Sequence, residues 1–209
     1  MDASKSFDAY EVIGVITPGS VVALMLALQW PEFRTLLGQE GLSVGGLGVF
    51  VVAAFVLGHL VQGIGNLMDS LFWALPGMPS AWVRSPRQQL LSPDQRMQLE
   101  SKVAAMEPGL ADLAAVNRTI WRGVTARIYS RVNAAGRAGR IDVCNRTYGL
   151  SRGLAAAFGL SALWLAYAAH GWTPQVGLAA ALTLVALYRM VRSGIHYART
   201  LFVTFVDLP

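Results

Sequence analysis

The sequence predicts an all-α integral membrane protein with four transmembrane helices and a helical, Arg-rich cytoplasmic insertion between the second and third helices. Composition is the first observation, because the 209 residues are 54% hydrophobic and only 14% charged. Such values are typical of membrane proteins and not of soluble globules. The second is a set of four long uncharged stretches, and the third is the concentration of basic residues between the second and third stretches.

The first two stretches are long enough to cross a bilayer. Val12 to Trp30 contains nineteen residues without a charge, and Leu42 to Asn66 contains twenty-five. A helix needs about 20 apolar residues to cross the hydrocarbon layer. The segment before Val12 is acidic and no small-residue cleavage site follows Trp30, which argues against a cleaved signal peptide.

Pro18 and Gly19 interrupt the first stretch and are a candidate hinge. Proline removes a backbone donor and glycine loosens the helix beside it, so we expect a kink there. The interruption marks either a functional hinge or pore element, or an ordinary proline kink of the kind common in membrane helices.

Three glycines open the second stretch, and aromatic residues follow it. Gly45, Gly46 and Gly48 predict close approach of a neighbouring helix. Phe72, Trp73 and Trp82 flank a Pro-Gly-Met-Pro break, which predicts an interfacial segment anchored at the level of the lipid headgroups.

The third and fourth stretches, Leu154 to His170 and Trp172 to Tyr188, are uncharged runs of seventeen residues separated by Gly171. They predict a helical hairpin. The chain is accordingly divided into a transmembrane hairpin with an interfacial segment (1–83), a basic cytoplasmic module (84–152), and a second hairpin with a basic tail (153–209).

The distribution of Lys and Arg predicts the orientation. Twelve basic residues lie between Arg84 and Arg152, and three arginines follow the fourth stretch, whereas the connection 31–41 carries one arginine against two glutamates. By the positive-inside rule, both basic regions and both termini are cytoplasmic, in the inner membrane of the cell.

Local signals predict two helices in the basic module. Ser92, Pro93 and Asp94 are typical of a helix start, and this helix is expected to run to about Met106. A second is expected from Leu110 to about Ala134, with its buried face formed by Leu113, Val116, Ile120, Val124 and Ile128. The glycine-rich stretch 133–153 reads as a flexible approach to the third transmembrane helix.

Four polar side chains form one helical stripe in the second stretch: His59, Gln62, Asn66 and Asp69. Polar residues at membrane depth usually point into a bundle or a water-filled cavity. The stripe could hold neighbouring helices together by hydrogen bonds, or it could line a cation pathway in an oligomer. A catalytic His59–Asp69 pair is disfavoured, because ten residues separate the two by about 15 Å along a helix.

The sequence contains no motif of a hydrolase, nucleotide-binding or metal site, so we expect neither an enzyme nor a cofactor. The lone Cys144 excludes a disulfide framework and a cysteine-rich metal site.

The arginines are the second candidate site. Six are proposed to bind a phosphate-bearing ligand: Arg118, Arg122, Arg127, Arg131, Arg137 and Arg140. Arg127 and Arg131 lie opposite Arg118 and Arg122 on the expected helix and should point toward its packing partner. Arginine offers forked donors to phosphate, and Trp121, Tyr129 and Tyr148 could stack on bases. The alternative is a role in topology and in attraction to anionic lipids.

A small multispan chain with a polar stripe and an Arg-rich cytoplasmic module resembles the small transmembrane effectors of bacterial anti-phage defence. The resemblance lies in the layout of the whole chain. It implies an oligomeric ion channel in the lipid bilayer, controlled by a cytoplasmic nucleotide or oligonucleotide. One chain of four helices does not readily enclose a conduit, so a homo-oligomer is required. The alternatives are a non-conducting adaptor that binds a larger partner protein, and a membrane-embedded enzyme with His59 as acid or base.

Overall fold

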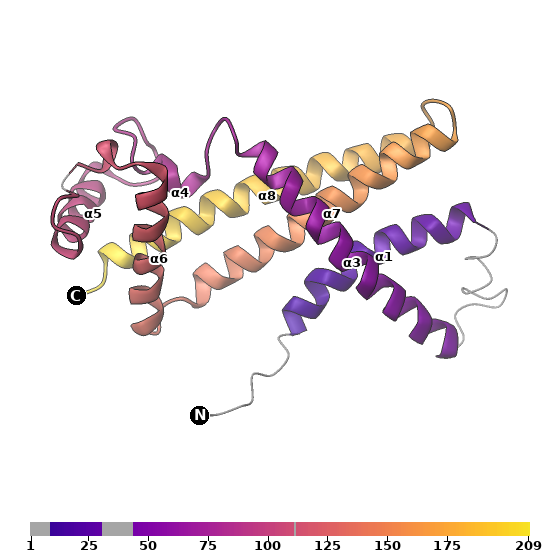
Figure 1. Cartoon of the computed structure of the whole chain (residues 1–209), viewed down its shortest axis with the longest axis horizontal. Coiled ribbons are helices and arrows are strands. Elements are labelled where there is room, and N and C mark those ends of the chain that lie inside the picture. The colour runs from indigo at the N-terminus through magenta and orange to yellow at the C-terminus, as the bar shows by residue number, and fades with distance from the viewer. Residues whose placement is uncertain (1–8, 31–43, 111) are drawn as a thin grey trace. The chain divides into compact units, whose positions relative to one another are not determined.

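The computed structural model describes residues 9–30, 44–110 and 112–209 (Figure 1). Within these ranges every regular element is a helix. In chain order they are α1 (Ala9–Gln29), α3 (Val44–Phe72), α4 (Pro79–Trp82), α5 (Pro93–Met106), the 3₁₀ turn η1 (Leu113–Ala115), α6 (Arg118–Ala134), α7 (Gly139–Ala168) and α8 (Pro174–Val206). The predicted outer connection 31–41 lies outside the described residues.

Among the described residues, four helices, α1, α3, α7 and α8, are long and apolar enough to span a membrane, so the prediction of an all-helical chain with four candidate membrane helices is confirmed. The cytoplasmic Arg-rich insertion stays a prediction. Helices α7 and α8 are longer than predicted, with 30 and 33 residues. The expected flexible approach at 139–153 was wrong, because it forms the first half of α7. The sequence keeps a buried residue on one helical face throughout this half, with Ile141, Tyr148, Ser151 and Ala155 all buried.

The chain folds into two compact units, each built from segments distant in the sequence. Unit 1 contains residues 1–72 and 146–190, and unit 2 contains residues 73–145 and 191–209. Unit 2 therefore shares residues 84–145 with the predicted basic module and also includes the end of the chain. The predicted boundaries at 83 and 152 stay predictions.

In unit 1, α1 and α3 cross at two glycines. A Cβ added to Gly19 would overlap the carbonyl oxygen of Ala54, and one added to Gly58 would overlap the carbonyl oxygen of Val15. The expected contact glycines were wrong where they can be checked, since a Cβ at Gly45 or Gly48 would meet nothing within 4 Å. The close approach is made instead by a pair of small residues four apart, Ala54 and Gly58, a spacing typical of membrane helix interfaces.

The second half of α7 joins this pair of helices. Val22 of α1, Val61 of α3, and Ala156 and Ala157 of α7 form one buried cluster. Small residues on α7 allow its backbone to come close, so dispersion contacts are dense.

The core of unit 2 is built from α5, α6 and the last turns of α8. Trp121 of α6 is only 2% exposed, and its ring centroid lies 5.8 Å from that of Phe202 in α8. The Trp121 indole N–H donates to the carbonyl oxygen of Ser80 at 2.8 Å, so its polar atom is satisfied in the core. Residues 191–206, expected to be a basic tail, contribute Leu201, Phe202 and Phe205 to this core.

The cap of α5 confirms the predicted start of that helix. The Ser92 side chain accepts from the Gln95 backbone N–H, and the Gln95 side chain accepts from the Ser92 N–H, which forms a capping box. The predicted start of the next helix was wrong. The Asn117 side chain caps α6 by accepting from Ile120 N–H at 2.8 Å, so the helix begins at Arg118 and not near Leu110.

Four of the five residues predicted for the buried face are buried: Leu113, Val116, Val124 and Ile128. The inward residues of α6 are Trp121, Val124, Ile128 and Val132. Ile120, predicted to be part of the core, is 46% exposed. The large indole ring of Trp121 occupies the core position that the apolar spacing had predicted for Ile120.

Two of the predicted headgroup anchors pack inside unit 2. Trp73 is buried, and its ring centroid lies 6.0 Å from that of Trp82. The Trp82 indole N–H donates to the carbonyl oxygens of Pro76 and Gly77 at 2.8 and 3.0 Å. These contacts close the turn between α3 and α4, where Gly77 has a positive φ of 71°.

Candidate functional site

The polar stripe of α3 divides into two halves that face different surroundings. Gln62 and Asp69, seven residues apart, bond to other helices of unit 1. His59 and Asn66, also seven apart, are exposed. Seven residues are close to two helical turns, so each pair keeps one direction while the two pairs differ by roughly 60°.

Gln62 joins three helices. Its Nε2 donates to the carbonyl oxygen of Gly14 in α1 at 2.9 Å. Gly14 lies four residues before Pro18, so its carbonyl has no helical N–H donor. On the other side, a Cβ added to Gly153 of α7 would come within 2.7 Å of Gln62 Nε2 and 3.1 Å of Pro18 Cγ. The absence of a side chain at Gly153 therefore leaves room for the amide and for the proline ring.

Arg152 of α7 lies beside this amide and was not among the predicted site residues. Its Nη2 donates to Gln62 Oε1 at 3.3 Å. Its Nε is buried and has no hydrogen-bond partner among the described residues. A charge with an unpaired donor at this depth is costly, which makes Arg152 a functional candidate. The sequence signal was its position directly before the third uncharged stretch.

Asp69 is held by Tyr148. The Tyr148 hydroxyl donates to the Asp69 carboxylate, and Tyr148 is only 8% exposed. A buried ring whose hydroxyl is already bonded has no free face for a nucleobase, so the expected stacking role of Tyr148 was wrong. The same holds for Trp121, whose rings lie in the core of unit 2.

Among the described residues, the exposed half of the stripe makes only local contacts. The His59 ring meets Phe55 edge to face, with centroids 4.6 Å apart. The Asn66 carbonyl accepts from the Ser70 hydroxyl at 2.9 Å, a bond within α3. These two side chains are the part of the stripe that unit 1 does not use for its own packing.

All six arginines proposed as ligand residues are exposed. Arg127 forms an ion pair with Glu107, and Arg137 Nη1 donates to the carbonyl oxygen of Asp207 at 3.2 Å. The inward direction expected for Arg127 and Arg131 was wrong. Each directly precedes a core residue, Ile128 or Val132, and is turned about 100° away from it on the helix.

Other arginines hold unit 2 together. Arg84 donates from Nη1 to the carbonyl oxygen of Val116 and from Nε to that of Ala81. Arg96 donates to the carbonyl oxygens of Ser85 and Arg84 and pairs with Glu100 at 3.0 Å. These forked contacts require guanidinium groups, so part of the excess of arginine over lysine is structural.

A pocket of about 410 Å³ in unit 2 brings basic side chains together. We call it the basic pocket; it is lined by Arg140, His196, Arg199, Thr200, Val203, Thr204 and Asp207. Arg140 comes from the first turn of α7 and the others from one face of α8 and the residue after it. Two guanidinium groups and two hydroxyl donors around one space are suited to binding an anion. The Asp207 carboxylate would compete with that anion for the same donors. Of the predicted ligand residues, only Arg140 lies here.

In the part of the chain that the structure describes, no three His, Cys, Asp or Glu side chains could hold a metal ion together. The comparisons with known proteins found no matching family model, no matching characterised protein and no matching solved structure. What the site can do must follow from its own geometry.

Proposed function

We propose that the chain is a membrane effector of the cell inner membrane whose cytoplasmic basic unit binds a phosphate-bearing ligand, a nucleotide or oligonucleotide. Binding would control ion permeation through a homo-oligomer. The observation that carries this proposal is the basic pocket, where Arg140 and Arg199 meet two threonine hydroxyls. The orientation and the role in bacterial defence come from the charge distribution and from the layout of the chain.

The chemistry of the pocket favours phosphate over a simple carboxylate metabolite. Arginine binds phosphate through two parallel N–H donors, and hydroxyl groups can fill the remaining acceptor sites. A volume of about 410 Å³ lies within the range of small-molecule sites. Arg122 and Arg131 are exposed on α6 of the same unit and add to its positive potential.

The conduit would be lined by the exposed half of the stripe. Gln62 and Asp69 already have partners within one chain, whereas His59 and Asn66 are exposed. In an oligomer, His59 and Asn66 from each copy would form the polar lining, with Asp69 supplying negative charge near the inner mouth.

The bonding of Gln62 and Asp69 also favours a second candidate, a non-conducting adaptor. In that case the stripe only stabilises the bundle, and the arginines hold anionic lipid or a partner protein. The two candidates differ in whether ligand binding changes ion flux.

Full-length protein in liposomes separates them. The probes are ATP and a six-nucleotide oligoadenylate, with binding and ion flux measured on the same preparation. We expect oligoadenylate to bind and to alter ion flux. The double variant Arg140→Gln with Arg199→Gln should weaken binding at least tenfold. It should also reduce the slope of log affinity against log salt concentration by the equivalent of about two phosphate contacts. The matched control, Arg87→Gln with Arg189→Gln, removes the same charge elsewhere. Binding without any flux would favour the adaptor, and equal binding by both double variants would remove the basic pocket as the site.

A further inference from the structure

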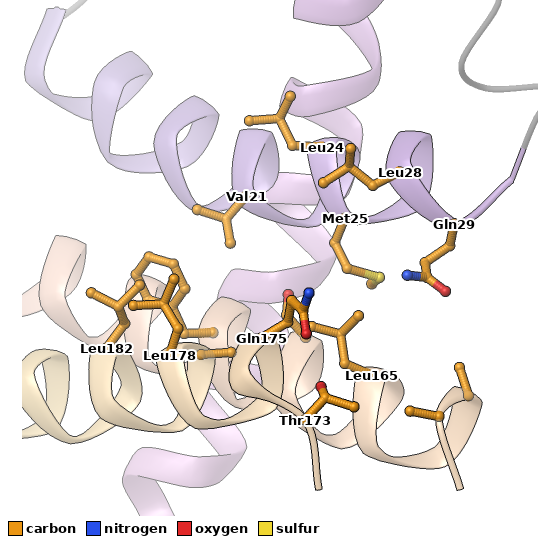
Figure 2. Close-up of a pocket in the computed structure, with 15 residues that line it drawn as sticks. Val21, Leu24, Met25, Leu28, Gln29, Leu165, Thr173, Gln175, Leu178 and Leu182 are labelled. Carbon is orange, nitrogen blue, oxygen red and sulfur yellow. The ribbon is translucent and has the colours of Figure 1, made fainter. Parts of the chain in front are cut away.

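Unit 1 contains a second hollow, an apolar cavity of about 640 Å³ between α1, α7 and α8 (Figure 2). Its apolar walls come from all three helices, including Val21 and Met25 of α1, Phe158 of α7, and Leu178 and Leu182 of α8. This volume lies within the range of sites that hold one organic molecule.

Four polar side chains line the cavity: Gln29, Ser161, Thr173 and Gln175. The Ser161 hydroxyl is already used, because it donates to the carbonyl oxygen of Ala157 at 2.8 Å. Figure 2 shows Gln29 and Thr173 toward the end away from Val21 and Leu182, with the carboxamide of Gln175 between Gln29 and Leu178. The Thr173 oxygen accepts from the Val176 N–H at 3.3 Å, which leaves its own proton to donate. The described lining contains no charged side chain. The end therefore suits an uncharged head with carbonyl or hydroxyl oxygens.

Aromatic residues place this end at a membrane surface. The Trp30 and Trp164 ring centroids lie 5.1 Å apart, and Tyr167 follows at 5.9 Å from Trp164. Trp172, beside Thr173, is 77% exposed. Tryptophan and tyrosine collect at the boundary between hydrocarbon and headgroups. The polar end of the cavity is then at headgroup depth and the apolar end within the hydrocarbon layer.

We infer that the apolar cavity binds one neutral amphipathic membrane lipid, a molecule of the diacylglycerol class with an uncharged head and two acyl chains, one of which enters the cavity. The head accepts hydrogen bonds from Gln29, Gln175 and Thr173. The first part of this acyl chain runs along α1 toward Val21, a depth of eight residues or about 12 Å, and the rest of the lipid lies in the bilayer. A phosphate head is disfavoured, because the described lining offers it no cationic partner. This inference does not depend on the proposed function, whose ligand site is the basic pocket of unit 2 and whose conduit would be lined by His59 and Asn66 of α3.

The test uses full-length protein in phosphatidylcholine nanodiscs that contain either dioleoylglycerol or phosphatidic acid with the same acyl chains. Native mass spectrometry then measures the lipid retained per chain. We expect dioleoylglycerol to be retained in preference to phosphatidic acid. Gln29→Leu with Gln175→Leu should lower its retention about tenfold, as expected for the loss of two neutral hydrogen bonds. Gln98→Leu, at an exposed position of α5, is the control for the change of side chain.

A second variant protects the test against a folding defect. Ala169→Phe places a ring in the lining of the cavity, and Ala181→Phe places the same ring at an exposed position outside it. The first should abolish retention and the second should leave it unchanged. A preference for phosphatidic acid, no retention of dioleoylglycerol by the parent, or equal retention by Ala169→Phe and Ala181→Phe would each overturn the inference.

Discussion

The side-chain amide of Gln62 donates at 2.9 Å to the carbonyl oxygen of Gly14, the carbonyl that Pro18 leaves without its helical donor. In a membrane, a freed backbone carbonyl must find another partner, because water does not reach it. The polar residue on α3 and the proline on α1 are therefore two parts of one arrangement. The stripe therefore satisfies the carbonyl that Pro18 leaves free, and a hinge at Pro18 and Gly19 stays a prediction.

A double-mutant cycle tests this arrangement. We expect Gln62→Leu to destabilise the protein by about 1 to 2 kcal/mol. The same change should cost less in the Pro18→Ala background, because alanine restores the N–H that bonds to Gly14. The measurement is reversible unfolding of the full chain in detergent micelles. Additive effects of the two changes would contradict the arrangement, and Asn66→Leu, at an exposed position of the same stripe, is the control.

The crossing of α1 and α3 should tolerate no side chain at Gly58. Because a Cβ there would overlap the backbone of Val15, we expect Gly58→Ala to lower stability by about 1 to 3 kcal/mol. Gly63→Ala is the matched control on the same helix, since nothing lies within 4 Å of its added Cβ. Gly63→Ala should leave stability unchanged or raise it slightly, because alanine is more favourable than glycine in a helix interior. Thermal unfolding of both variants gives the comparison, and equal losses would show that the crossing is not close.

Local signals in the sequence predicted the elements well where the determining residues were neighbours. The capping box of Ser92 and Gln95 depends on four consecutive residues, and the four spans depend on uninterrupted apolar runs. The start of α6 was missed because two signals in the sequence conflict. Asn117 is a helix cap, but the helical spacing of apolar residues that begins at Leu113 continues past it. Periodicity alone does not show which side chain, Ile120 or Trp121, occupies the core.

The sequence predicts which helix face carries the polar residues of the candidate site, but it does not predict which residues they contact. Sequence spacing places Gln62 and Asp69 on one side of a helix. Their partners lie far along the chain, with Arg152 90 residues from Gln62 and Tyr148 79 residues from Asp69. The packing of α1 and α7 against α3 decides which half of the stripe is used within the chain. For the same reason Arg199 and His196, distant from Arg140, were not assigned to a site with it.

Asp69 offers a way to separate permeation from packing, on the premise of the proposed channel. We expect Asp69→Asn to lower cation flux in liposomes while the oligomer stays intact, because a negative charge at the inner mouth is lost. Tyr148→Phe removes the hydroxyl donor but keeps the carboxylate, so it should leave flux unchanged or raise it. Asp69→Asn removes the charge but keeps an amide oxygen that can accept from the Tyr148 hydroxyl, whereas Tyr148→Phe keeps the charge and loses this hydrogen bond. If they behave alike in flux and in stability, Asp69 serves the bundle alone.

The structural arginines should not accept lysine. Arg84 donates to the carbonyl oxygens of Val116 and Ala81 from two different nitrogens, and a lysine ammonium does not reproduce this fork. We expect Arg84→Lys to destabilise unit 2 by about 1 to 3 kcal/mol despite the retained charge, because a buried carbonyl loses its donor. Arg87→Lys, at an exposed position three residues later, should change stability by less than about 0.5 kcal/mol. Unfolding of the full-length variants, followed by tryptophan fluorescence, checks both values. Equal stability of Arg84→Lys and Arg87→Lys would mean that only the charge matters at Arg84. The excess of arginine over lysine in this region would then be explained by ligand binding.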